Sequence, residues 1–242
     1  MGTQFRQGDL GTASALLERQ WKTLRTWLGR LMEDDHSFGS APSLLPGFTL
    51  TELVAHVGRA MDALAVTEPA VPGTVPLTLA EYLGTYPDRA VEIARTTREI
   101  AAEIAPDPLG AVDRMAATAF ARLAELGPDD VVVQARRGPI TLSDMVTSRL
   151  IELVVHGDDL ARSVPRPGAR PVEPDALQLV AQTLLAIVVA RGGWSLELVD
   201  PLLWVRLATG RVPYDVDRLA EALSAPFTSD SVPDLGRMLP LL

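Results

Sequence analysis

Residues 149–162 read RLIELVVHGDDLAR, and this stretch decides the fold class that the sequence predicts. Its first half is almost entirely Leu, Ile and Val, which indicates a helix that packs against neighbours over most of its surface. Arg149, Glu152, His156 and Asp159 follow an i, i+3, i+7, i+10 spacing, so they lie along one edge of that helix. Two interpretations of this edge are open: a solvated helix face, or the ligands of a metal ion.

Helical periodicity recurs along the rest of the chain. Thr49 followed by Glu52 is a capping-box pattern, so we expect a helix to begin at Thr49. Four long amphipathic segments favour a helical bundle with an accessory C-terminal region. The predicted helices cover 12–33, 49–64, the run from 79 to 105 with a new start at Pro87, 108–126, a segment from Thr141 through 149–162, 174–191 and 215–223.

Strand signals are few. DVVVQARRGPITL (130–142) predicts a short hairpin that turns at Arg137-Gly138, and SLELV (195–199) predicts a short strand. The stretch 66–77 holds three prolines and is predicted to be a loop. Pro165, Pro167 and Pro171 separate the helix through 149–162 from the C-terminal part of the chain, so we expect a boundary between residues 165 and 166.

Composition limits the classes of protein. The 242 residues fit one domain, or one plus a small appendage, and 47% of them are hydrophobic, with a mean hydropathy of +0.16. No uninterrupted run of eighteen apolar residues is present, so no transmembrane helix is expected. The absence of cysteine excludes disulfides, a cysteine nucleophile and thiolate metal ligands.

Charge and residue usage add to this picture. The formal charge of −9 and pI near 4.8 disfavour nucleic-acid and membrane-surface binding. Lys22 is the sole lysine and asparagine is absent, which is typical of a GC-rich bacterial genome. Because the first residues also lack the apolar core of a secretory signal, we expect a cytoplasmic protein.

Two of the three histidines lie within apolar helical runs, in the related pentapeptides ELVAH (52–56) and ELVVH (152–156); His36 lies in a polar loop. Glu52 is placed to cap its helix, whereas Glu152 lies about three turns inside its own, where no free N–H groups remain.

Glu152 therefore needs another partner, and one cation shared with His156 would supply it. With His56 from a neighbouring helix, the set gives two imidazoles and one carboxylate, which is how catalytic zinc is held. The alternative is an ordinary glutamate–histidine pair on a wet helix face. Neither a serine-nucleophile motif nor a phosphate-binding glycine loop is present, and paired acid–base carboxylates remain open.

These segments resemble a known family. PGFTLTELVAHVGRAMDAL (46–64) resembles the P-G-W-T-V-x-D-L-x-A-H-L segment of mycothiol-dependent maleylpyruvate isomerases, which have the DinB-like four-helix fold. RLIELVVHGDDLARSV (149–164) is similar to the E-L-x-x-H-x-x-D-L-A segment of that family. DPLLWVRLATGR (200–211) resembles the end of the sterol-carrier-like domain that often follows, and the three motifs keep the family's order.

The resemblance implies a mainly α fold: a DinB-like four-helix bundle over 1–165 and a small α/β appendage over 166–242, a reduced sterol-carrier-like region. It implies a divalent metal, normally zinc, on His56, Glu152 and His156, with Asp159 orienting an imidazole. It also implies arginines that hold the acid and the thiol, for which Arg206 and Arg211 are the catalytic candidates and Arg89 is one in the bundle.

The activity implied is a thiol-dependent isomerisation or transfer on a small organic acid or natural-product intermediate. Mycothiol, or a similar small thiol, would be the cosubstrate of a monomer or homodimer. Only RGGWSLELV joins the 174–191 helix to DPLLWVRLATGR, so most of the sterol-carrier-like sheet is expected to be missing, and the substrate stays open. The alternatives are a metal-dependent hydrolase on the same scaffold and a non-catalytic small-molecule-binding protein; iron and nickel also suit these ligands.

Overall fold

The structure, a computed structural model, describes residues 9–34, 38–164, 170–226 and 232–241. The chain divides into two compact units, unit 1 up to Glu173 and unit 2 from Pro174 to Leu242. The sequence places the boundary between residues 165 and 166, within the prolines, and residues 165–169 lie outside the described ranges. The boundary in the structure comes where the next helix starts.

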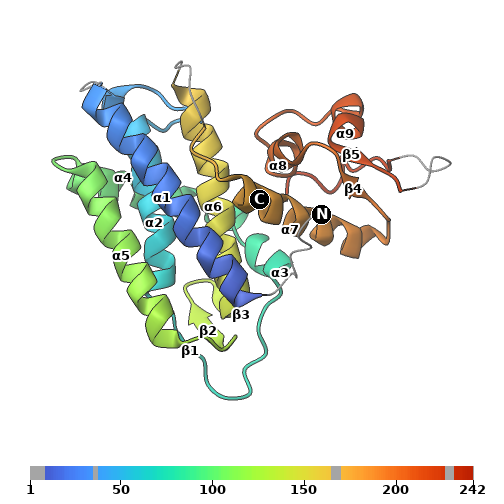
Figure 1. Ribbon diagram of the computed structural model, residues 1–242, viewed down its shortest axis with the longest axis horizontal. Coiled ribbons are helices and arrows are strands. Elements are labelled where there is room, and N and C mark those ends of the chain that lie inside the picture. Colours follow the sequence, from blue (N-terminus) through green and yellow to red (C-terminus); the bar gives the residue numbers. More distant parts are fainter. Residues whose placement is uncertain (1–8, 35–37, 165–169, 227–231, 242) are drawn as a thin grey trace. The chain divides into compact units, whose positions relative to one another are not determined.

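Unit 1 is built on four long helices that lie side by side: α1 (Leu10–Asp34), α2 (Leu50–Ala65), α5 (Pro108–Leu126) and α6 (Leu142–Ser163) (Figure 1). α2 packs on α5 and α6, and α1 packs on α6 and α5, which closes the bundle. Leucine, valine and alanine side chains from all four helices fill the core. The prediction of a mainly helical bundle is confirmed.

The ends of these helices follow from local chemistry. The Thr49 hydroxyl accepts a hydrogen bond from the Glu52 N–H, and the Glu52 carboxylate accepts one from the Thr49 N–H at 2.6 Å, so the predicted capping box is present. α5 starts with Pro108 in its first turn and ends before Gly127, whose φ of 85° suits glycine. The bounds predicted for both helices are confirmed to within a residue.

A small sheet lies in the same unit. Strands β1 (Glu68–Pro69), β2 (Val132–Ala135) and β3 (Gly138–Thr141) pair antiparallel in the order β1-β2-β3. Ala135 pairs with Gly138, so the hairpin turns at residues 136–137, one residue earlier than predicted. β1 was missed because it lies in a proline-rich stretch that is typical of a loop, where one short strand can still pair at a sheet edge.

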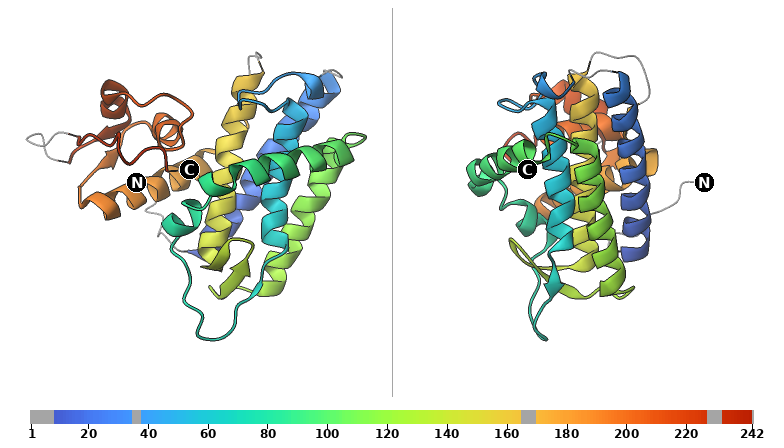
Figure 2. Two further views of the ribbon diagram at one scale, coloured as in Figure 1. Left: turned by 180° about the vertical axis from the view of Figure 1, so that it is seen from behind. Right: turned by 90° about the vertical axis from the view of Figure 1, so that its left-hand side faces the viewer.

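The segment between α2 and α5 contains shorter helices. α3 (Leu79–Leu83) is followed by a 3₁₀ turn over Pro87–Arg89 and by α4 (Ala90–Ile104). α4 packs on α2 and runs across the bundle helices instead of along them (Figure 2). This crossing brings residues of α4 beside the middle of α2, where His56 lies.

α6 is the most enclosed helix of the bundle. All residues from 145 to 160 are buried, and the fractional exposure of the polar edge ranges from 9% at Glu152 to 0% at Asp159. The interpretation of this edge as a solvated helix face is therefore wrong. Because buried charged groups need partners, the polar side chains of α6 must be matched by other polar groups inside the bundle.

Unit 2 contains α7 (Pro174–Gly192), α8 (Pro201–Ala208), α9 (Val216–Ala222) and a two-stranded antiparallel sheet of β4 (Glu197–Leu198) and β5 (Leu223–Ser224). Trp204 of α8 is fully buried, and its indole N–H donates to the Ala181 carbonyl of α7 at 3.0 Å. The small α/β appendage is thus as expected.

α7 is the one helix among the described residues that is long and apolar enough to cross a membrane. Half of its most apolar window is buried in the structure, and α8 packs on it. Such burial is typical of the core helix of a small unit, so length and composition alone do not make α7 a membrane span.

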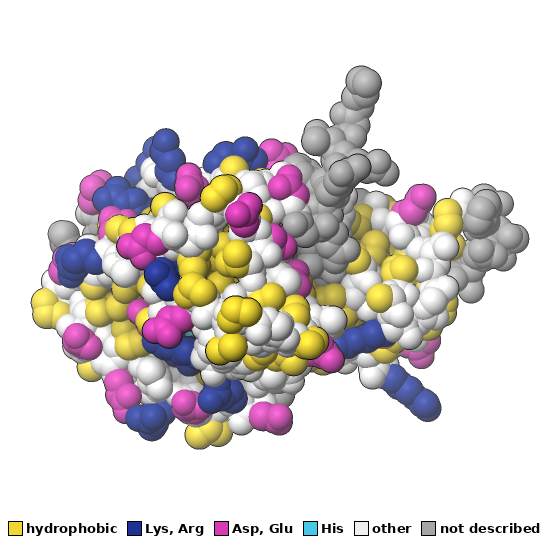
Figure 3. Space-filling model, turned by 90° about the horizontal axis from the view of Figure 1, so that it is seen from below, with side chains coloured by type: hydrophobic (Ala, Val, Ile, Leu, Met, Phe, Trp, Pro, Cys, Tyr) yellow, Lys and Arg dark blue, Asp and Glu magenta, His cyan; other side chains and the backbone are white. Residues whose placement is uncertain are grey.

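Charges are mixed on the face of the molecule drawn in Figure 3. Basic and acidic side chains alternate there, with apolar ones between them, and no large area carries a single sign. Many of the arginines of unit 1 pair with nearby carboxylates, as Arg25 does with Asp113 at 2.8 Å. A cluster of side chains that carry the same charge is therefore notable wherever it occurs in this chain.

Candidate metal centre

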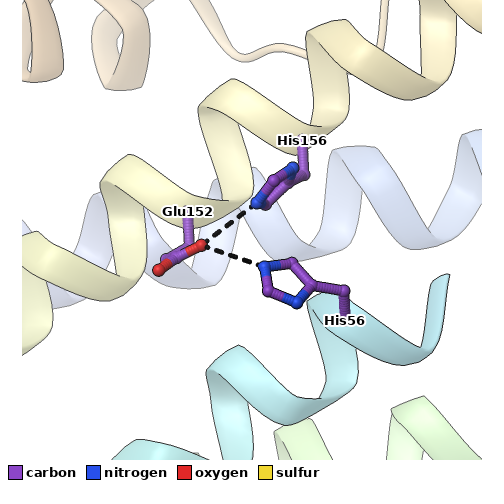
Figure 4. Close-up of side chains that lie close together, drawn as sticks. All are labelled: His56, Glu152 and His156. Carbon is purple, nitrogen blue, oxygen red and sulfur yellow. Dashed lines mark hydrogen bonds and ion pairs between the residues drawn. The ribbon is translucent and has the colours of Figure 1, made fainter. Parts of the chain in front are cut away.

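Two helices bring three candidate ligands together. His56 comes from α2, and Glu152 and His156 come from successive turns of α6 (Figure 4). The Glu152 Oε2 atom lies 3.1 Å from His156 Nε2 and 3.6 Å from His56 Nε2. The two imidazole rings meet edge to face, with their centroids 4.6 Å apart. Residues almost a hundred positions apart in the chain thus converge on one point.

Each imidazole is held through its other nitrogen. The Nδ1 atom of His156 lies 3.0 Å from Oδ2 of the fully buried Asp159, and Nδ1 of His56 lies 3.3 Å from the Thr97 hydroxyl of α4. Both rings therefore turn Nε2 toward Glu152. A partner at Nδ1 that fixes the ring and its tautomer is typical of metal-binding histidines.

Electrostatics at the site favour an ionised carboxylate. Burial alone would raise the pKa of Glu152, but hydrogen bonds from His156 and His56 outweigh it and hold that pKa well below its ordinary value. Burial and the neighbouring His156 lower the pKa of His56. Burial also opposes charge on His156, yet Asp159 and Glu152 raise its pKa. One negative charge thus lies between two imidazoles.

The donor set fits a divalent cation. The three ligand atoms all lie within 4.8 Å of one another, and each residue is buried. Two ligands about 2.1 Å from a tetrahedral zinc ion are about 3.4 Å apart, which is close to the 3.1 and 3.6 Å separations from Glu152. Two imidazole nitrogens and one carboxylate oxygen leave a fourth position for a further ligand, as in catalytic zinc sites.

Arg149 lies one turn before Glu152 and is almost fully buried. Its guanidinium donates to the Tyr86 hydroxyl at 2.9 Å and to the Ala60 carbonyl at 3.2 Å. Burial and the Glu152 carboxylate raise the pKa of Tyr86 to about 12, despite the opposing charges of Arg149 and Arg137, so its phenol is protonated at neutral pH. Arg149 therefore satisfies its donors mainly on neutral oxygens.

A cavity of about 380 Å³ opens beside the candidate ligands, within unit 1. His56 and Glu152 form part of its wall, together with side chains from α2, α4, the segment after α3 and the β2–β3 turn. This volume is in the range of small-molecule sites. The charged side chains of the wall are Arg59, Arg89, Glu92, Arg136, Arg137, Arg149 and Glu152.

Other residues singled out in the sequence have different surroundings. Arg89 lines the cavity and pairs with Glu92 at 3.5 Å. Arg206 lies in the last turn of α8 and Arg211 donates to the Thr209 carbonyl at 2.8 Å, so both belong to unit 2. Their role toward acid or thiol remains a prediction, and His36 lies outside the described residues.

The structure also shows polar residues that sequence reasoning missed. Arg59 lies three residues after His56 on α2, and this helical spacing was a usable signal. Thr97, Tyr86 and Arg137 gave no comparable signal, because the crossing of α4, the segment after α3 and the β2–β3 turn place them at the site. Long-range packing decides such positions.

Most of unit 1 is similar to a known protein domain. Residues 17–161 match the model of the mycothiol maleylpyruvate isomerase N-terminal domain. The chain belongs to this family. All three candidate ligands lie inside the mycothiol maleylpyruvate isomerase match, whereas Arg206 and Arg211 lie beyond it.

A solved structure extends the likeness to most of the chain. It is described as the crystal structure of the mycothiol-dependent maleylpyruvate isomerase, and it is 18% identical in sequence, with a TM-score of 0.52. The match covers 93% of this chain and 95% of the other, which shows a shared fold. No curated protein matches the sequence.

Proposed function

We propose that this member of the mycothiol maleylpyruvate isomerase family is a cytoplasmic metalloenzyme. It uses a low-molecular-weight thiol, mycothiol or a similar one, to isomerise a small organic acid or to transfer the thiol to it. The observation that carries the proposal is the convergence of His56, Glu152 and His156 beside a cavity that His56 and Glu152 help to line. The family match supports the class of chemistry.

Each candidate ligand would have its own role in binding the metal. His56 and His156 each offer Nε2, while Thr97 and Asp159 hold the opposite edges of the rings. Asp159 accepts the Nδ1 proton of His156, which makes that ring a better donor. The Glu152 carboxylate offsets part of the charge of a divalent ion. Bound there, zinc or a similar ion would lower the pKa of a thiol and so supply a thiolate at neutral pH.

The thiolate of the cosubstrate adds to a conjugated double bond of the acid, forming a C–S bond as the π bond breaks and its electron pair moves onto the conjugated carbonyl as an enolate. Rotation about the resulting single bond, followed by loss of the thiolate as the double bond forms again, gives the isomer. Protonation of the enolate carbon with the C–S bond retained gives transfer. The cavity encloses the acid during this sequence. Arg206 and Arg211, in what we take to be a shortened sterol-carrier-like region, are proposed to bind acid and thiol.

Metal content tests the proposal first. We expect about one zinc ion per wild-type chain, measured by mass spectrometry of purified protein, and a loss of that zinc in His56→Ala and Glu152→Ala. Glu52→Ala is the matched control, since Glu52 caps α2 and is outside the ligand set. A wild-type protein that takes up no divalent metal would leave a binding protein as the better account.

Thiol dependence tests the reaction class. With a panel of unsaturated small acids, turnover should require added thiol and should disappear in the variants that lose zinc. Turnover of esters or amides by the zinc-loaded protein without thiol would favour the hydrolase instead. Metal without turnover in either assay would contradict the enzymatic part of the proposal.

A further inference from the structure

The cavity beside the candidate ligands holds an excess of positive charge. Five arginines and two glutamates line it, in a chain whose net charge is −9. Because one of the two glutamates is Glu152, already placed between two histidines, little negative charge faces the open volume. A concave wall of this kind focuses a positive potential on whatever enters.

Three of the five arginines have partners in the protein. Arg89 pairs with Glu92 at 3.5 Å, and Arg136 pairs with Asp62 at 2.6 Å. Arg149 donates to a hydroxyl and to a backbone carbonyl. These three arginines thus have ion-pair or hydrogen-bond partners within the protein.

Arg59 and Arg137 are different. Among the described residues, neither forms an ion pair, and the buried Arg59 Nε and Arg137 Nη1 atoms have no hydrogen-bond partner. Arg137 is nevertheless held in place, with its guanidinium 3.7 Å from the ring centroid of Tyr86 and 4.4 Å from that of Tyr82. Buried N–H groups without acceptors are rare in folded proteins and call for a specific explanation.

The crowding of these cations is unfavourable on its own. Burial lowers the pKa of Arg59, and the charges of Arg136, Arg137 and Arg149 lower it further against the opposing effect of Glu152. An anion bound between the guanidinium groups of Arg59 and Arg137 would relieve this repulsion. Guanidinium groups bind carboxylates with paired, charge-assisted hydrogen bonds.

We infer that Arg59 and Arg137 form the carboxylate-anchoring subsite for the acid that reacts at the metal centre. Arg59 lies one turn beyond His56 on α2, so the anchored group would lie in the cavity that His56 and Glu152 help to line. A volume of about 380 Å³ suits a small organic acid. The inference rests on the proposed function for the reaction, but the anchor itself needs neither zinc nor thiol.

The test is binding of maleate to the full-length chain, measured by calorimetry without thiol, with the zinc content of each sample determined. Arg59→Gln and Arg137→Gln should each weaken maleate binding about 10-fold or more, since each removes a charge-assisted bond. Arg137→Lys keeps the positive charge but loses the planar guanidinium, with its paired donors and its stacking on Tyr86. Its maleate affinity should therefore lie between those of the wild type and Arg137→Gln.

Arg114→Gln is the matched control, because it removes one exposed positive charge outside the cavity. It should change maleate affinity less than about 2-fold, the effect expected for a screened surface charge. Thermal unfolding and zinc content of the variants show that each has folded; if one of the pair does not fold, the other decides.

The results separate this inference from the proposed function. Weakening in both cavity variants, with zinc unchanged, supports the subsite, and it does so even if the wild-type protein proves to hold no metal. Unchanged maleate affinity in both overturns the subsite while the metal site stands. Weaker binding of reduced glutathione with unchanged maleate binding would assign the arginines to the thiol and would equally overturn it.

Discussion

Two pentapeptides of nearly the same sequence, ELVAH (52–56) and ELVVH (152–156), have different structures around their glutamates. Glu52 lies in the first turn of α2 and accepts the Thr49 N–H at 2.6 Å. Glu152 lies in the middle of α6, buried, with an imidazole nitrogen on either side. Both histidines, by contrast, turn toward the same centre.

The difference shows that position within the helix decides what a carboxylate does. In the first turn, free N–H groups compete for it, and the helix itself uses the charge. In the middle of a helix no such donors remain, so the charge has to be met by other side chains or by a ligand. The pair of motifs therefore offers its own internal control, with the same residue types in two settings.

Glu152→Gln should have the largest effect on zinc affinity. The amide keeps the size of the side chain but loses the charge that lies between the two histidines, so zinc affinity should fall more than about 100-fold. Competition with a chromogenic chelator measures the affinity. Glu52→Gln, which preserves the capping box, should bind zinc as the wild type does. Equal zinc affinity in the two glutamine variants would remove Glu152 from the ligand set.

Asp159→Asn should have the next largest effect. Asp159 accepts the Nδ1 proton of His156 at 3.0 Å, and an amide accepts less strongly and can turn the wrong way. Zinc affinity should fall about 10- to 100-fold. Asp158→Asn, one residue earlier, is the matched control, and a similar loss there would assign the effect to general disturbance of α6.

Thr97→Val should weaken zinc binding less. The substitution removes the hydroxyl 3.3 Å from His56 Nδ1 and keeps the volume of a fully buried side chain. One neutral hydrogen bond of about 0.5–1.5 kcal/mol corresponds to about a 2- to 12-fold loss of affinity. Thr96→Val changes the neighbouring threonine in the same way. A stronger effect at position 96 would mean that Thr97 does not orient His56.

Glu52→Ala should leave zinc binding almost unchanged. It removes half of the capping box of α2, so we expect a loss of about 0.3–1.5 kcal/mol in the free energy of unfolding. Urea denaturation of the zinc-free protein measures this loss without a contribution from metal binding. A change of zinc affinity as large as that in the Glu152 variants would show that the two motifs are not distinct.

Much of the bundle could be predicted from sequence because its signals are local. Apolar periodicity, the capping box at Thr49 and the glycine after α5 act over a few residues, and the helices begin and end where these signals place them. The candidate ligands could be selected for the same reason. Glu152 and His156 are one turn apart, and Glu152 has no role within its own helix.

Local signals could not show the burial of the polar edge of α6, which depends on helices from elsewhere in the chain. They also could not show that Arg137, in a hairpin turn, would stack on Tyr86 beside the ligands. A turn arginine is usually a solvated residue, and only the pairing of β2 with β3 directs this one into the cavity wall. Sequence thus brought out the three candidate ligands but not the residues that surround them.

The arginine-lined cavity has a consequence for timing. A divalent cation that approaches along it meets a repulsive field, whereas an organic acid is drawn in. Binding of a metal ion at this site should then be slow. Its dissociation should be slower still, since two of the candidate ligands lie on an enclosed helix. On the proposed function, the acid would enter and leave in each catalytic cycle, so the same cavity would serve a metal ion that stays bound and an acid that exchanges.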